Sequence, residues 1–182
     1  MKSKIHKHNN SIIISAGKKI FLAVAFLAAI MVQKSFAQES TKTNPLLALL
    51  TSYLDIKNAL VATDAAMASV KATELIKAID GIDMKTLSEA DNNAFMAAQD
   101  KLKADAQAIT ASDKIETQRT TFSSLSNNIY TFAKAAKLST EPVYQQYCPM
   151  KKMYWLSSEA AIKNPYYGKM MLTCGKVTET LK

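Results

Sequence analysis

Residues 44–62, NPLLALLTSYLDIKNALVA, contain the signals that decide the fold. Asn44 is a favourable N-cap residue, and Pro45 suits the first position of a helix. Behind them, apolar residues recur every three or four positions, which is the spacing of one helix face. The segment therefore predicts a helix from Pro45 to Ala62. The apolar positions are Leu46, Leu49, Leu50, Tyr53, Leu54, Leu60 and Val61.

The same periodicity predicts three further helices. One is expected at residues 65–80, followed by Gly81 as a left-handed C-cap. The next is expected at residues 88–110, and Asp113 with Glu116 resembles a capping box that begins the fourth. Because the connections are short, neighbouring helices are expected to pack antiparallel. The fold class is therefore mainly α, an up-and-down four-helix bundle over residues 45–137.

The C-terminal segment, residues 140–182, differs in composition. It is rich in aromatic residues, and three prolines interrupt any helical pattern. Short strands or extended segments are expected at residues 143–147 and 171–177, and a short helical turn at residues 155–162. We expect this irregular or short-β segment to pack on one end or side of the bundle.

The N-terminus has the features of a secretory signal peptide. Lysines precede an apolar run at residues 20–32, and Ser35-Phe36-Ala37 provides the small residues that signal peptidase reads. A run of about 13 residues is short for a bilayer-spanning helix, which needs about 20. We predict that residues 1–37 are cleaved and that residues 38–182 form one periplasmic or secreted domain without a membrane span. Retention of the run as an uncleaved anchor is the alternative.

Cleavage would change the chemistry of the chain. The signal contains both histidines and six lysines, so the formal charge would fall from +8 to about +2. Without imidazole, catalytic triads and histidine-ligated metal sites are excluded, and we expect no enzymatic activity. Arg119 is the only arginine, which argues against nucleic-acid binding.

Sulfur is concentrated in the C-terminal segment. Thiolates and thioethers select Cu(I) and related soft ions over hard cations. The candidate metal ligands are Cys148, Met150, Met153, Met170, Met171 and Cys174. Aromatic residues nearby are expected to surround the ion and limit access of water. They are Tyr147, Tyr154, Trp155, Tyr166 and Tyr167.

A structural role for the sulfur is the alternative. An exported protein with two cysteines often joins them, and a disulfide between Cys148 and Cys174 would close a loop of about 26 residues. Such a disulfide would contribute about 3 kcal/mol. The methionines would then fill gaps against aromatic rings. The residues alone leave both interpretations open.

Several motifs resemble an uncharacterised family of secreted bacterial domains. These are YQQYCPM at 144–150, YWLSSE at 154–159, IKNPYYG at 162–168, MMLTCG at 170–175 and, upstream, YLDIKNAL at 53–60. Members of that family stand alone or are fused to periplasmic adaptor subunits of copper and heavy-metal efflux pumps. The resemblance implies a soft-metal association and a periplasmic efflux adaptor as partner. The core Cys148-Pro149-Met150 is also similar to a short motif of heavy-metal-binding domains, with Lys151 in place of its histidine.

We therefore expect a periplasmic accessory protein that binds Cu(I) or another soft metal and serves heavy-metal efflux or homeostasis. The alternative is a disulfide-stapled helical module that binds a protein partner without metal.

Overall fold

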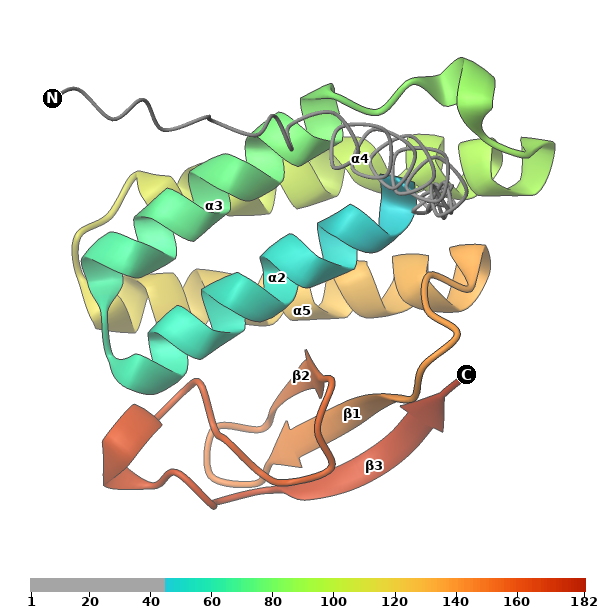
Figure 1. The fold of residues 1–182 in the computed structure, drawn as a ribbon. Coiled ribbons are helices and arrows are strands. Elements are labelled where there is room, and N and C mark those ends of the chain that lie inside the picture. Colours follow the sequence, from blue (N-terminus) through green and yellow to red (C-terminus); the bar gives the residue numbers. More distant parts are fainter. Residues whose placement is uncertain (1–44) are drawn as a thin grey trace, which may run out of the picture. The chain divides into compact units, whose positions relative to one another are not determined.

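A computed structural model of the chain describes residues 45–182, which form four helices and a small sheet (Figure 1). The predicted signal peptide lies outside the described residues. The helices are α2 (Pro45–Ala62), α3 (Ala65–Asp80), α4 (Glu89–Thr110) and α5 (Ile115–Ala136), with a short 3-10 helix, η1 (Met84–Thr86), before α4. The predicted boundaries of α2 and α3 are confirmed.

Local capping explains where two helices begin. Asp64 accepts a hydrogen bond from the backbone N–H of Met67 at the start of α3, and Ser88 accepts one from Asp91 at the start of α4. Each side chain satisfies a backbone donor that has no partner within its helix. The predicted left-handed C-cap at Gly81 is wrong, because Gly81 has φ −85° and its N–H continues the helical bonding to Lys77.

The predicted capping box before α5 is also wrong. Lys114 occupies the N-cap position, and its side chain forms no capping hydrogen bond. The Glu116 carboxylate instead accepts a hydrogen bond from Arg119 Nη1 at 2.7 Å, and Arg119 lies about one helical turn after Glu116. Asp113 therefore has no reciprocal partner of the capping-box type.

The C-terminal segment forms a three-stranded antiparallel sheet in the order β2-β1-β3. The strands are β1 (Val143–Cys148), β2 (Met153–Ser157) and β3 (Lys176–Leu181). The loop between β2 and β3 contains the 3-10 helix η2 (Gly168–Met170). The strand predicted at residues 143–147 is confirmed. The helical turn predicted at 155–162 is wrong, because Trp155 pairs with Gln146 in the β1–β2 ladder.

The strand predicted at residues 171–177 is wrong over most of its length. Turns occupy the residues after η2, and β3 begins only at Lys176. β3 pairs with β1, whose register shifts between Gln145 and Gln146. The sequence pattern of this segment does not predict the start of β3, because pairing with β1 determines where the ladder begins.

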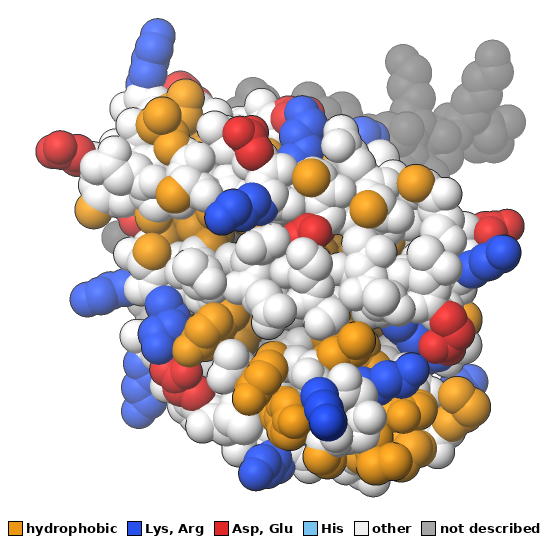
Figure 2. All heavy atoms as spheres, turned by 180° about the vertical axis from the view of Figure 1, so that it is seen from behind, with side chains coloured by type: hydrophobic (Ala, Val, Ile, Leu, Met, Phe, Trp, Pro, Cys, Tyr) orange, Lys and Arg blue, Asp and Glu red, His pale blue; other side chains and the backbone are white. Residues whose placement is uncertain are grey.

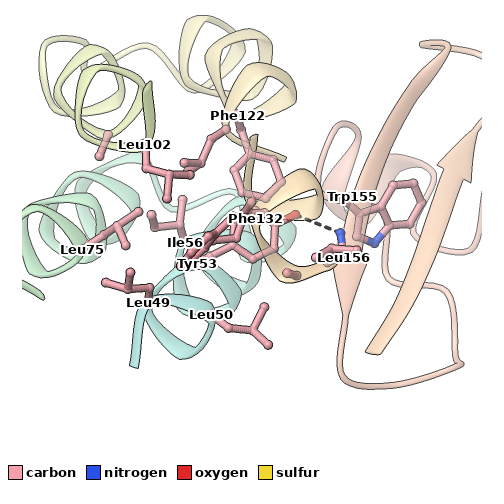
Figure 3. Packing of buried hydrophobic residues seen from close by; sticks show 14 of the residues in the cluster. Leu49, Leu50, Tyr53, Ile56, Leu75, Leu102, Phe122, Phe132, Trp155 and Leu156 are labelled. Atoms are coloured by element: carbon pink, nitrogen blue, oxygen red, sulfur yellow. Dashed lines mark hydrogen bonds between the residues drawn. The ribbon is translucent and has the colours of Figure 1, made fainter. Parts of the chain in front are cut away.

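The elements lie in layers (Figure 1). α2 packs against α3 and α5, α4 packs against both α3 and α5, and β2 lies against α5. Figure 3 shows the apolar side chains that meet between the helices, including Leu49, Ile56, Leu75 and Leu102. Within the described residues, α2 alone has the length and hydropathy of a membrane-crossing helix. Its apolar face is part of this core.

Tyr53 joins the helices to the sheet. Its ring is fully buried and stacks on Phe122, with ring centroids 5.1 Å apart. The Tyr53 hydroxyl lies 2.8 Å from Ser126 Oγ and accepts a hydrogen bond from the backbone N–H of Leu156 at 2.9 Å (Figure 3). Burial raises the pKa of Tyr53 far above its ordinary value, and the hydrogen bonds with Ser126 and Leu156 offset only part of this rise.

Candidate functional site

The two cysteines meet at one end of the sheet. Cys148 ends β1 and is fully buried, whereas Cys174 lies in the loop before β3 and is partly exposed; both are free thiols. Loss of solvation raises the pKa of the Cys174 thiol, and the neighbouring Cys148 raises it further through its charge and a hydrogen bond. Because Tyr147 pairs with Lys176 in the β1–β3 ladder, the fold brings close together two thiols that are 26 positions apart in the sequence.

The β1–β2 pairing explains which residues accompany Cys148. Cys148 is opposite Met153 and Gln146 is opposite Trp155, so these four side chains lie on the same face of the sheet. Met153 is half-buried and packs against the core. Cys148 therefore has a thioether neighbour across the ladder as well as the Cys174 thiol.

The loop between β2 and β3 covers this face. A Cβ at Gly175 would lie only 2.9 Å from the Trp155 ring, so a glycine lets the backbone pass close to the indole. Tyr166 packs edge-on against Trp155, with centroids 5.9 Å apart. Burial raises the pKa of Tyr166, and the nearby Cys148 raises it further. Two large buried rings thus lie on the side of the sheet that carries Cys148.

The other predicted aromatic neighbours lie elsewhere. Tyr147 and Tyr154 are opposite each other in the β1–β2 ladder, with ring centroids 4.6 Å apart. Because Tyr147 immediately precedes Cys148 in the strand, both tyrosines lie on the face of the sheet opposite to Cys148. Tyr167 is half-buried beneath the Lys151 amine, which lies 5.1 Å from the ring centroid. Only Trp155 and Tyr166, of the five predicted aromatic residues, are therefore placed on the Cys148 side of the sheet.

Three of the predicted methionine ligands are exposed. The exposed fractions are 63% for Met150 in the β1–β2 turn, 74% for Met170 and 37% for Met171. The Met171 carbonyl accepts a hydrogen bond from the Cys174 N–H, so Met171 is linked to Cys174 through its backbone. Residues 45–182 contain no group of three or more His, Cys, Asp or Glu side chains placed to hold a metal ion. The compact sulfur group is therefore Cys148, Cys174 and Met153.

Sequence reasoning missed Asn164, which positions Cys174. This side chain is fully buried, and its Nδ2 donates to the Cys174 carbonyl at 2.7 Å. Its Oδ1 accepts from the N–H of Tyr166 at 2.8 Å, and its backbone N–H donates to the Leu172 carbonyl. The pair Asn164-Pro165 indicated only a turn, because an asparagine that bonds distant backbone has no distinguishing local pattern.

Gln146 holds another part of the same loop. Its buried Nε2 donates to the Glu159 carbonyl at 2.8 Å and lies near the carbonyls of Ala160 and Ala161. A polar side chain in the middle of β1 thus satisfies backbone acceptors that the loop cannot satisfy itself. The β2–β3 loop is held over the thiols by side-chain amides rather than by regular secondary structure.

Arg119 anchors this loop to the helices. Its guanidinium is buried and donates from Nε to the Pro165 carbonyl at 2.9 Å. Its Nη2 donates to the Leu60 carbonyl and to Thr63 Oγ1 at the end of α2. The sequence signal was available, since a charged residue three positions before Phe122 falls within the apolar stripe of α5.

A family model described as "Protein of unknown function (DUF3347)" matches residues 49–141, about half of the chain. The chain belongs to this family. The DUF3347 match includes most of α2 and all of α3, α4 and α5, and it ends before β1. The thiol pair and the motifs of residues 144–175 lie outside the matched span. No curated protein and no solved structure matches the chain.

Proposed function

We propose that this protein is an exported, periplasmic accessory that binds a soft metal ion, Cu(I) in the first place, through Cys148 and Cys174. It would serve heavy-metal efflux or homeostasis, with a periplasmic efflux adaptor as its partner. The proximity of the two thiols, with Cys148 at the end of β1 and Cys174 in the loop that leads into the paired strand β3, is the observation that carries the proposal. Two thiolates with a thioether beside them form a donor set that favours Cu(I) over hard cations.

The surroundings support this choice. Trp155 and Tyr166 exclude water from the buried side of the pair, while partial exposure of Cys174 leaves a route for the ion. Asn164 and Gln146 hold the loop that carries Cys174, and outer partners of this kind tune metal sites. The four helices, which we interpret as an up-and-down bundle, would act as the support rather than the reactive part.

The proximity of the two thiols also favours a second function. Adjacent thiols in an exported protein can oxidise to a disulfide, which would fix the β2–β3 loop over the sheet. The protein would then be a stapled helical module whose surface binds a partner without metal.

A thiol count combined with a Cu(I) competition titration distinguishes the two functions. We expect the protein, isolated without reductant, to show two free thiols when it is denatured for counting, and to bind about one Cu(I) when folded under anaerobic conditions. Cys148→Ser or Cys174→Ser should lower the affinity more than about 100-fold, since loss of a ligand costs more than loss of an outer partner. A triple Met150→Ser, Met170→Ser, Met171→Ser variant is the matched control and should bind nearly as well as the wild type.

The stapled module would be the function if the protein isolated without reductant has no free thiol and the reduced protein binds no Cu(I). A large loss of affinity in the triple methionine variant would show that the exposed thioethers, and not the thiol pair with Met153, hold the ion.

The affinity for Cu(I) should increase with pH. Both thiols must lose a proton to bind the ion, and the pKa of Cys174 is raised, so metal binding at neutral pH displaces protons. We expect the apparent affinity to rise up to about tenfold per pH unit for each thiol, and to continue rising above the ordinary thiol pKa of about 8.5. Competition titrations across neutral and alkaline pH measure this slope. A flat profile would indicate thioether ligands, which do not titrate.

A further inference from the structure

The loop before β3 exposes consecutive apolar side chains. Residues 169–173, KMMLT, are all exposed, and the exposed fractions are 74% for Met170, 37% for Met171 and 38% for Leu172. Single apolar residues are common on protein surfaces, but three in succession at one loop are unfavourable unless they contact something. The proposed metal site does not use them.

Other exposed apolar residues lie at the same end of the sheet, where β1 ends and β2 and β3 begin. Met150 lies in the β1–β2 turn, and that turn adjoins the loop because the Lys151 amine lies over the Tyr167 ring. Figure 2 shows hydrophobic side chains interspersed with lysines over the lower part of the molecule, where Figure 1 places the sheet. We call this the sheet-end surface: Met150, Lys151, Lys152, Tyr154, Lys169, Met170, Met171, Leu172, Lys176 and Val177.

The charge of this surface is positive. Residues 140–182 contain six lysines and three glutamates, whereas residues 45–139 contain ten basic and eleven acidic residues. Two of the three glutamates are paired away from the loop, Glu159 with Lys163 and Glu179 with Lys134. Within residues 45–182, no ion pair involves Lys152, Lys169 or Lys176. The apolar loop is therefore bordered by cations that are not neutralised locally.

We propose that the sheet-end surface docks the protein on an anionic phospholipid bilayer. Met170, Met171 and Leu172 would enter the boundary between headgroups and acyl chains, and the lysines would contact lipid phosphates. The composition favours lipid over a protein partner, because protein interfaces are enriched in arginine and depleted in lysine. This surface has four lysines and no arginine. The proposal does not depend on metal binding.

Vesicle co-sedimentation tests the proposal with the wild-type protein. We expect binding to phosphatidylcholine vesicles that contain phosphatidylglycerol, little binding to pure phosphatidylcholine, and weaker binding as salt is added. Lysine contacts with an anionic surface are worth about fivefold in affinity each, so Lys169→Glu with Lys176→Glu should weaken binding more than about 25-fold. Replacing Met170, Met171 and Leu172 with serine should weaken it at least about tenfold.

Matched controls come from α4, which lies in the helical layer away from the sheet. Met96→Ser and Lys101→Glu change an exposed methionine and an exposed lysine there and should leave vesicle binding unchanged. Circular dichroism would confirm that every variant folds. If a loop variant fails to fold, the dependence of wild-type binding on lipid composition and salt still tests the proposal.

Absence of binding to the anionic vesicles, or equal binding to both lipid compositions, would overturn the proposal. So would unchanged vesicle binding in both loop variants, even if those variants lost binding to an efflux adaptor protein. The serine variant should retain its Cu(I) affinity, which separates failure of this proposal from failure of the proposed function.

Discussion

Replacing Arg119 with methionine should lower the free energy of unfolding by about 2–4 kcal/mol. The buried guanidinium donates hydrogen bonds to the Pro165 carbonyl, the Leu60 carbonyl and Thr63 Oγ1. Methionine fills a similar volume but donates none of them, so buried acceptors would lose their partner. Urea denaturation of the wild type and the variant measures the difference.

Glu116→Gln is the matched control. It removes the ion pair with Arg119 but leaves the three buried hydrogen bonds, and Glu116 itself is mostly exposed. Because water screens an ion pair whose carboxylate is mostly exposed, and the guanidinium keeps its other hydrogen bonds, the control should lose less than about 1 kcal/mol. Equal losses in Arg119→Met and Glu116→Gln would show that the ion pair, and not the bonds to the loop, stabilises the fold.

Replacing Gly168 with alanine should have an effect of similar or larger size. Gly168 has φ +55°, a conformation that costs an L-residue about 1–2 kcal/mol. A Cβ there would also lie 2.5 Å from Thr63 Oγ1 and 2.7 Å from Arg119 Nη2. Overpacking typically costs about 1–3 kcal/mol more, so the total expected loss is about 2–5 kcal/mol.

Gly81→Ala controls for the change from glycine to alanine itself. Gly81 has a right-handed φ of −85°, and a Cβ there would meet only backbone oxygens, the nearest at 3.2 Å. We expect a change of less than about 1 kcal/mol in denaturant unfolding. Combining Gly168→Ala with Arg119→Met should cost less than the sum of the two, since both disturb the same contact. Additive losses would place the two residues in independent roles.

These contacts connect stability to the candidate site. Arg119 holds Pro165, the neighbouring Asn164 holds Cys174, and Cys174 lies close to Cys148. A continuous series of bonds therefore runs from α5 to the thiol pair. Variants that release the loop from α5 should also separate the thiols.

The helices could be predicted from the sequence because their signals are local. In α2, apolar spacing and the proline at the first position act within a few residues, and Asp64 and Ser88 cap helices whose first turns they adjoin. The errors arose where distant residues decided the outcome. Trp155 was expected in a helical turn, but pairing with Gln146 placed it in β2.

The candidate site shows the same division. Composition alone identified the sulfur-rich segment and the absence of histidine after residue 8. It did not distinguish Met153, which lies beside Cys148, from Met150 and Met170, which are exposed. Strand register made that distinction, because alternate residues point to opposite faces.

By itself, the sequence determined the four helices, the location of the sulfur and the charge contrast between residues 45–139 and residues 140–182. Only the tertiary structure decided which sulfurs meet, which rings cover them and that Arg119, Gln146 and Asn164 hold the covering loop. Helix propensity and capping depend on neighbours along the chain. Buried hydrogen bonds and strand pairing depend on neighbours in space, which residue order alone does not specify.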